Sequence, residues 1–164
     1  MPPRSRRAQT LGFLGWLVLV LLAGGLGALA SVEAASFYAQ LNRPGWAPPA
    51  GVFGPVWSLL YVLMAVAAWL VWREPAQPSR APALGVFVLQ LAVNALWSWL
   101  FFAWHRGAWA LADVLLLVAL IAVAIVLFRR VRPLAAWLLL PYLAWVAFAS
   151  ALTWAVWRAN PGVL

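Results

Sequence analysis

Acid–base and nucleophilic chemistry has few possible carriers in this chain, which contains three acidic residues, one histidine and no cysteine. A metal site would have few ligands to draw on, and no Ser/His/Asp triad can be assigned. We therefore expect no metal centre, no required cofactor and no catalytic residue. The abundant functional side chain is tryptophan, at 13 of 164 residues. Its apolar ring and single N–H donor suit a membrane–water boundary or an aromatic-walled pocket.

Several aromatic and polar residues are spaced four apart, which places them on one face of a helix. Trp57 and Tyr61 form one such pair. Gln90 and Asn94 form another, and Trp97 continues their stripe. Two interpretations of the amides remain open: they line a pocket, or they hydrogen-bond neighbouring helices at roughly 1 kcal/mol each.

A second group of chemically useful residues lies nearer the C-terminus. Asp113 is about two turns into the apolar stretch 108–128, where the positive end of a helix would favour an ionised carboxylate. Trp109 lies one turn earlier on the same face. Asp113 is predicted either to pair with a loop donor or an arginine, or to form part of a polar site. Further residues fall along one side of the last apolar stretch at helical spacing: Tyr142, Trp145, Ala149, Leu152 and Thr153.

The elements that carry these residues are predicted to be membrane-spanning helices. Hydrophobic residues make up 67% of the chain, charged residues only 9%, and the mean hydropathy is +0.95. A soluble fold needs more charge to cover its surface. Five stretches reach the roughly 20 residues that cross a bilayer as helix: 11–32, 52–72, 83–104, 108–128 and 134–157. We expect residues 1–164 to form one domain, an all-α integral membrane protein with a five-helix bundle.

The formal net charge of +8 comes from eleven arginines, which lie between the apolar stretches. This placement indicates topology signals and lipid-headgroup contacts, and it disfavours nucleic acid as a partner. Five spans put eight arginines on one side and three on the other, which predicts a cytoplasmic N-terminus and a C-terminus outside. Whether the membrane is an inner or an outer one stays open. The first stretch exceeds the 7–15 residues of a signal-peptide core, so we interpret it as a span.

Residues 36–55 are predicted to form a structured, non-helical loop between the first two spans. Four prolines lack backbone donors, and four aromatic residues favour folding back onto the bundle. The prolines are Pro44, Pro48, Pro49 and Pro55, and the aromatic residues are Phe37, Tyr38, Trp46 and Phe53. Two roles are equally supported by the residues: a lid over a site, and an anchor at the membrane boundary.

Several segments together carry a family resemblance. They read LNRPGWAPPAGVFGPVWSLLYVLM, QLAVNALWSWLFF, WALADVLLL, LPYLAWVAFASAL and VWRAN. In this order and at this spacing, from about Tyr38 to Asn160, they resemble the translocator protein family, also called the tryptophan-rich sensory protein or peripheral benzodiazepine receptor family. The resemblance implies a five-helix bundle, usually a homodimer, with a ligand pocket that opens toward the first loop. Family ligands are tetrapyrroles such as protoporphyrin IX, sterols in animal members, and synthetic drugs.

The resemblance also implies which residues bind the ligand. The pocket wall would comprise Trp57, Tyr61, Asn94, Trp97, Trp109, Ala112, Leu116, Trp145, Ala149 and Leu152, and the lid would carry Pro44, Trp46, Pro48 and Pro49. Asp113 follows the family's W-A-L-A-D pattern, and its role is open. Two departures stand out. Thr153 replaces the family's usual asparagine, and Trp154 breaks the sterol motif of animal members, so sterol binding is not expected as the native role.

The function implied is a membrane-embedded binding protein for tetrapyrroles and related hydrophobic molecules, with a sensory, regulatory or transport role in tetrapyrrole metabolism. A flat macrocycle would stack on indole faces, and Arg43 is the nearest candidate for its propionates. The alternatives are a light-dependent porphyrin-degrading oxidase, which would use Trp57 and Trp145, and a small-molecule transporter. Small residues on the first span, Ala23, Gly24, Gly25, Gly27 and Ala28, offer a surface for close helix contact in the bundle or a dimer.

Overall fold

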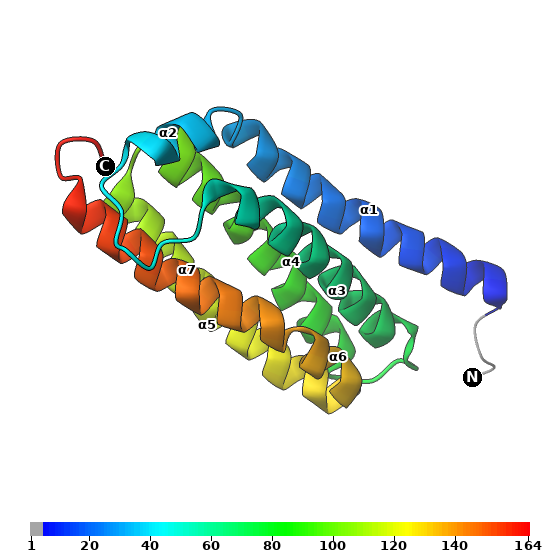
Figure 1. Ribbon diagram of the computed structural model, residues 1–164. Helices are drawn as coiled ribbons and strands as arrows, with labels where there is room; N and C mark the ends of the chain where they lie inside the picture. The colour runs from blue at the N-terminus through cyan, green and yellow to red at the C-terminus, as the bar shows by residue number, and fades with distance from the viewer. Residues whose placement is uncertain (1–4) are drawn as a thin grey trace.

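The computed structural model describes residues 5–164, and within that range it is helical with no strand. Figure 1 shows a bundle of long helices with two short ones at its ends. In chain order the elements are α1 (Arg6–Ala30), α2 (Ala34–Gln40), η1 (Ala50–Val52), α3 (Phe53–Arg73), α4 (Arg80–Ser98), η2 (Trp99–Ala103), α5 (Gly107–Val131), α6 (Pro133–Leu138) and α7 (Leu140–Ala159).

Five of these helical stretches are long and apolar enough to cross a membrane: α1, η1 with α3, α4 with η2, α5, and α6 with α7. They coincide with the five predicted spans, so the chain is a multi-pass integral membrane protein. The boundaries differ by several residues at some ends. α1 begins at Arg6 and α5 continues to Val131, because arginine side chains can extend from a helix end toward water without ending the helix.

The last span is interrupted at Leu139, where α6 gives way to α7. Pro141 explains the break, because a proline ring has no N–H for the helical ladder and disfavours helical geometry in the residue before it. Proline in the first turn of a new helix is well tolerated. The predicted span from 134 to 157 is confirmed as one span, Pro133–Ala159, and the local break at Leu139 is a detail that the prediction did not include.

The segment 36–55 is less irregular than predicted. α2 continues to Gln40, the turn η1 forms at Ala50–Val52, and α3 begins at Phe53, which leaves residues 41–49 as the irregular part. No glycine or proline lies in Ala34–Gln40, so nothing there prevents a helix. As predicted, the segment folds back onto the bundle: Leu41 is buried with Phe101 and Val156.

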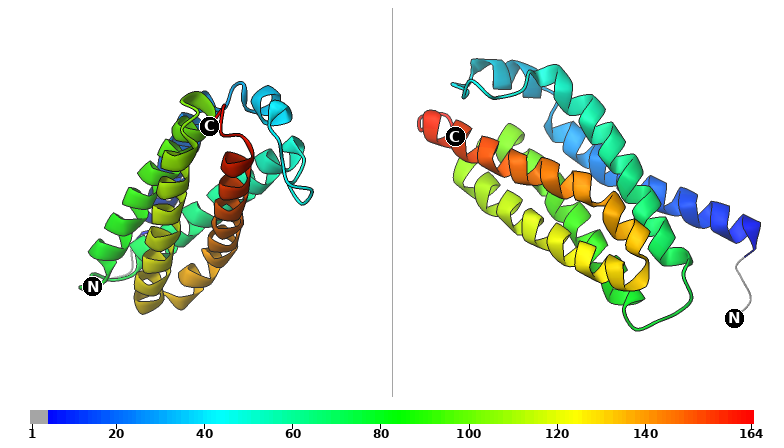
Figure 2. Two further views of the ribbon diagram at one scale, coloured as in Figure 1. Left: turned by 90° about the vertical axis from the view of Figure 1, so that its left-hand side faces the viewer. Right: turned by 60° about the horizontal axis from the view of Figure 1, so that its bottom comes forward.

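The two ends of the bundle hold different sets of connections. The start of α1, the α3–α4 loop and the α5–α6 junction lie at one end, while α2, the 41–49 loop and the C-terminus lie at the other (Figures 1 and 2). At the first end, Glu74 pairs with Arg132 at 3.4 Å, and Arg80 donates to the Glu74 carbonyl at 2.6 Å. The grouping of the arginine-rich connections follows the prediction, and which side of the membrane they face remains a prediction.

The core lies between α3, α4, α5 and α7, with α1 on the outside. Small residues of α3 are fully buried and allow close helix contact, while Phe87 of α4 stacks on Phe128 of α5 with ring centroids 5.6 Å apart. α4 and α5 form the predicted antiparallel hairpin, and His105 in its turn has a φ of 53°. Between α4 and this turn, Trp99–Ala103 forms a π-helical turn, a local widening that is frequent near functional sites.

Candidate functional site

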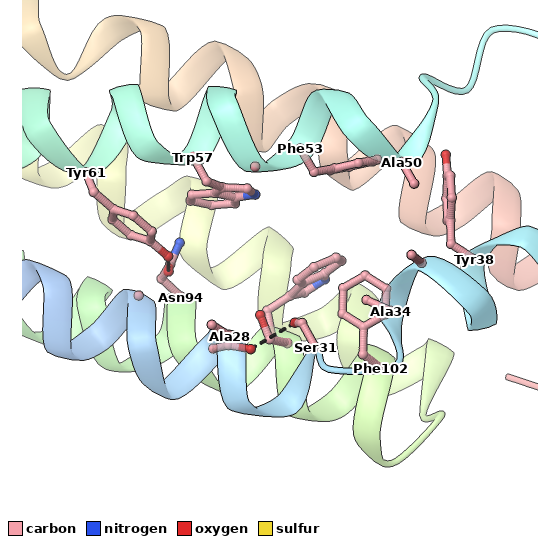
Figure 3. A pocket seen from close by; sticks show the side chains of 16 residues that line it. Ala28, Ser31, Ala34, Tyr38, Ala50, Phe53, Trp57, Tyr61, Asn94 and Phe102 are labelled. Atoms are coloured by element: carbon pink, nitrogen blue, oxygen red, sulfur yellow. Dashed lines mark hydrogen bonds between the residues drawn. The ribbon is translucent and has the colours of Figure 1, made fainter.

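A cavity with a volume of about 380 Å³ lies at the α2 end of the bundle (Figure 3). α1, α2, α3 and the end of α4 enclose it, and it falls within the size range of small-molecule sites. Its lining residues are Gly24, Gly27, Ala28, Ser31, Ala34, Ala35, Tyr38, Ala50, Phe53, Gly54, Trp57, Tyr61, Asn94, Trp97, Ser98 and Phe102. We call this space the main cavity.

Aromatic side chains from α3 and α4 form most of the walls of the main cavity. Trp57 and Tyr61 are four residues apart on α3, and their ring centroids lie 5.4 Å apart. Phe53 precedes them by one turn. From α4, Trp97 stacks on Phe101 with centroids 5.2 Å apart and an angle of 12°. The helical spacing therefore brings the predicted Trp57, Tyr61 and Trp97 to one site.

The α1 side of the main cavity is made of small residues at helical spacing. Gly24, Gly27, Ala28 and Ser31 recur every three or four residues, so they share one face. In Figure 3, Ala28 and Ser31 lie across the cavity from Phe53 and Trp57. A Cβ atom at Gly24 would lie 2.7 Å from the Tyr61 ring, which shows how closely α1 approaches α3 there. The cavity thus has large aromatic side chains opposite a face that takes up little space.

A hydrogen-bonded network begins at the inner end of the main cavity. The Tyr61 hydroxyl donates to Asn94 Oδ1 at 3.1 Å, and Asn94 Nδ2 donates to the Tyr142 hydroxyl at 3.0 Å. Tyr142 in turn donates to Gln90 Oε1 at 2.7 Å. Gln90 and Asn94 therefore do bond to neighbouring helices, and Asn94 also lines the cavity. The network fixes the relative positions of α3, α4 and α7 beside the site.

One donor at the cavity has no acceptor. Within the described residues, Nε1 of Trp97 is buried and makes no hydrogen bond. A buried donor in this state costs about 1–3 kcal/mol relative to a satisfied one. Oδ2 of Asp113 is the other buried side-chain atom in this condition among residues 5–164. Asp113 is 8% exposed on α5 and is not among the residues that line the main cavity.

A second, much smaller void lies on the far side of the same aromatic wall, with a volume of about 20 Å³. It shares Phe53, Trp57, Asn94 and Trp97 with the main cavity. Its other lining residues come from α5 and α7: Val114, Leu117, Trp145, Val146 and Ala149. We call this space the small void. The predicted Trp145 and Ala149 thus line the small void and are not among the residues that line the main cavity.

Hydrogen bonds attach the proline-rich loop to the C-terminal end of α7. The Asn42 N–H donates to Asn160 Oδ1 at 2.8 Å, and Asn160 Nδ2 donates back to the Asn42 carbonyl at 2.9 Å. Trp46 packs edge-on against Phe148 with centroids 5.7 Å apart. The predicted lid residues are Pro44, Trp46, Pro48 and Pro49, and none of them lines the main cavity. Their role in ligand binding stays a prediction.

The main cavity is covered instead by α2 and η1, through Ala34, Ala35, Tyr38 and Ala50. The Tyr38 hydroxyl donates to the Pro48 carbonyl at 3.0 Å, which connects the loop to this cover. The Arg43 guanidinium lies 4.6 Å from the Tyr38 ring centroid. Burial raises the pKa of Tyr38, and Arg43 acts in the opposite direction. Because an ordinary tyrosine pKa is already near 10, the phenol is neutral and available as a donor.

The predicted α5 residues lie away from both spaces. Trp109 is 69% exposed, Leu116 is 51% exposed and Ala112 is also exposed. The structure therefore corrects the expectation that they share a wall with Trp57 within one chain, and their role in binding stays a prediction. The physical reason is helix rotation, because the face of α5 that meets the bundle is Ala110, Asp113, Val114, Leu117 and Ile121. Leu152 is buried elsewhere, in a cluster with Leu41 and Phe101.

The sequence does not identify several of the lining residues as site residues. It indicates Gly24, Gly27 and Ala28 only as a helix-contact surface, and their three- and four-residue spacing with Ser31 is the available signal. Tyr38 and Phe53 stand out only as aromatic residues of the loop. The remaining lining residues are Ala34, Ala35, Ala50, Gly54, Ser98 and Phe102, and the sequence does not distinguish them from ordinary residues of an apolar helix.

Comparison with known proteins places these observations in a family. A model of the TspO/MBR family matches residues 16–158. Translocator protein of Homo sapiens is 43% identical over 132 residues, which cover 79% of this chain and 78% of that protein. Protein CrtK of Rhodobacter capsulatus is 38% identical over 152 residues, covering 92% and 93%. Tryptophan-rich protein TspO of Archaeoglobus fulgidus is 35% identical over 147 residues, covering 88% and 94%. The chain belongs to the TspO/MBR family.

Proposed function

We propose that this protein binds flat, hydrophobic tetrapyrroles of the protoporphyrin IX type in the main cavity and serves as a sensory or regulatory binding protein of tetrapyrrole metabolism. The observation that carries the proposal is the composition of the cavity. Six aromatic side chains line a space of about 380 Å³: Tyr38, Phe53, Trp57, Tyr61, Trp97 and Phe102.

The arrangement of these side chains favours a planar ligand. Aromatic faces on α3 can stack on a macrocycle with a gain of about 0.5–1.5 kcal/mol per ring pair beyond the area buried. The α1 face opposite offers only Gly24, Gly27, Ala28 and Ser31, so a flat molecule can approach the α1 backbone closely. A bulky three-dimensional ligand would gain less from such a narrow space.

Polar groups around the cavity suit the two kinds of polar atom in a porphyrin. The unpartnered Nε1 of Trp97 can donate to a ring nitrogen or another acceptor once a ligand enters. Arg43 stands over Tyr38, which is part of the cavity cover. A propionate directed toward this cover would find a guanidinium there, a strong partner for carboxylates.

A titration of purified protein with protoporphyrin IX in the dark tests the proposal. Quenching of tryptophan fluorescence and the shift of the porphyrin absorption band report binding. Trp57→Ala is expected to weaken binding by about 10- to 100-fold, because it removes a large aromatic ring from the cavity wall. Trp137→Ala is the matched control, because Trp137 is 68% exposed on α6.

The control is expected to leave the dissociation constant unchanged within about twofold. Equal weakening by both substitutions would show that the loss is not specific to the cavity wall and would rule out the cavity as the site. Full affinity in Trp57→Ala would do so as well.

A further inference from the structure

A second feature of interest lies at the opposite end of the bundle from the main cavity. It is a surface groove of about 610 Å³ between the first turns of α1 and the last turns of α3, lined by Arg6, Gln9, Thr10, Phe13 and Trp69. The two helices run side by side there, and the start of α1 extends past the end of α3 (Figures 1 and 2). We call it the α1–α3 groove.

The floor of the α1–α3 groove is aromatic. Trp69 Nε1 donates to the Gln9 carbonyl at 3.1 Å, which joins α3 to α1. Phe13 meets Trp69 edge-to-face with centroids 5.8 Å apart. The indole N–H is thereby satisfied by protein, and the ring faces remain as an apolar surface. Such a surface suits an aliphatic chain better than a polar solute.

The rim of the groove is cationic. Arg6 lines it directly, and the Arg73 guanidinium lies 4.7 Å from the centroid of the Trp69 ring. Both arginines are exposed and stand at helix ends, at the water boundary of their spans. Phe13 is seven residues further into α1, about 10 Å along the helix axis. The groove is therefore amphipathic, with positive charge at the membrane boundary and an apolar floor deeper in the membrane.

The acidic residues of the chain do not neutralise this rim. Glu74 pairs with Arg132, Asp113 is buried in α5, and Glu33 lies at the other end of the bundle. Within residues 5–164, no ion pair is formed by Arg6 or Arg73. A second copy of the chain would bring the same three acidic residues and no spare carboxylate for this end. The charge complement must come from a different kind of molecule.

We propose that the α1–α3 groove binds one anionic glycerophospholipid from the adjoining leaflet. Arg6 and Arg73 hold its phosphate, because guanidinium groups match phosphate oxygens in a bidentate geometry. One acyl chain lies along Phe13 and Trp69. α1 is the least buried of the five spans, so a lipid at this position covers the helix that the protein itself covers least. This site is separate from the proposed porphyrin cavity and does not depend on it.

The test uses the full chain in vesicles of equimolar dioleoyl phosphatidylglycerol and dioleoyl phosphatidylcholine, followed by native mass spectrometry of the retained lipids. We expect the unaltered protein to retain phosphatidylglycerol over phosphatidylcholine on the order of tenfold. The double variant Arg6→Gln/Arg73→Gln should retain the two lipids about equally. The matched control is Arg129→Gln/Arg130→Gln, which removes the same charge at the same end of the bundle, on α5, and should keep most of the preference.

A second variant fills the groove without changing its charge. Thr10 is exposed and lines the groove, so Thr10→Trp should exclude the acyl chain and remove lipid retention, even if the arginine variant proves too unstable to purify. Equal loss in the two arginine pairs would reduce the effect to general attraction by a basic end and overturn the proposal. So would displacement of the lipid by added inorganic phosphate, which would indicate a phosphate site with no part for the acyl chain.

Discussion

The main cavity and the small void have a common wall but differ almost twentyfold in volume. Phe53, Trp57, Asn94 and Trp97 face both spaces, which measure about 380 Å³ and about 20 Å³. The difference comes from what stands opposite the wall. On the α1 side it is glycine, alanine and serine, while on the α5 and α7 side it is valine, leucine and tryptophan with a single alanine. The same aromatic residues therefore border an open cavity on one side and a packed core on the other.

This comparison changes how the aromatic residues of the chain are interpreted. An indole face identifies a possible wall, but the residues across from it decide whether the space stays open. The resemblance to the translocator protein family implied a pocket shared by four spans, including the one that α5 forms. In this structure the open space lies instead toward α1 and α2. Substitutions on the two sides of the wall should accordingly have different consequences.

The largest effect is expected from filling the main cavity. Ala28→Phe places a ring in the narrow space opposite Trp57, so porphyrin affinity should fall about 100-fold, or roughly 2.7 kcal/mol of binding free energy. The free energy of unfolding should change by less than about 0.5 kcal/mol, because the new ring enters existing space. Titration in the dark and unfolding in detergent measure the two quantities.

Leu29→Phe is the matched control for this substitution. Leu29 is the next residue on α1 and is 65% exposed, so its ring would point outward from the bundle. Its porphyrin affinity should match that of the unaltered protein. If Ala28→Phe binds porphyrin with full affinity, the ligand does not occupy the space beside α1. The larger volume of the main cavity would then have no bearing on porphyrin binding.

Filling the small void should act on stability rather than on binding. Ala149 lines that void, and about 20 Å³ cannot take a phenyl ring, so Ala149→Phe overpacks the core. The free energy of unfolding should fall by about 1–3 kcal/mol, and porphyrin affinity should change by less than about threefold. Denaturation in mixed detergent measures the first. Lost affinity at unchanged stability would instead place the ligand on the α7 side of the wall.

The residues of this wall could be predicted from the sequence because their side-chain types and spacing identify them. Polar residues are costly in lipid, so Asn94 had to face inward, and the four-residue spacings fixed Trp57 with Tyr61 on one helix face. Five spans followed from composition and length alone, and the hairpin of α4 and α5 from its short turn. These are local properties, and the structure retains them.

Two features could not be predicted from the sequence, for physical reasons that differ. α5 is apolar nearly all the way round, so its rotation is set by packing against α4 and α7, and Asp113 marks only the edge of its buried face. The exposed position of Trp109 could therefore not be predicted from the sequence. On α1, small residues such as Gly27 fit either a tight helix contact or a cavity wall. Only the position of α2 and α3 decides between them, and that is a tertiary property.

The smallest effect should come from removing a single donor in the shared wall. Trp97→Phe keeps an aromatic ring against Phe101 but deletes the buried Nε1 that has no acceptor within the described residues. If a bound porphyrin supplies the acceptor, affinity should fall about fivefold, close to 1 kcal/mol. The free energy of unfolding without ligand should not fall by more than about 1 kcal/mol, since no protein hydrogen bond is lost.

Trp99→Phe gives the opposite pattern and serves as the control. Its Nε1 already donates to the Leu26 carbonyl at 3.1 Å, so removing it should lower stability by about 1 kcal/mol and leave porphyrin affinity unchanged. Thermal unfolding and dark titration of both variants separate a donor held for a ligand from a donor used for folding. If Trp97→Phe binds porphyrin as tightly as the unaltered protein, the indole contributes its ring face alone. The main cavity would then select its ligand by shape, without a hydrogen bond from the wall it shares with the core.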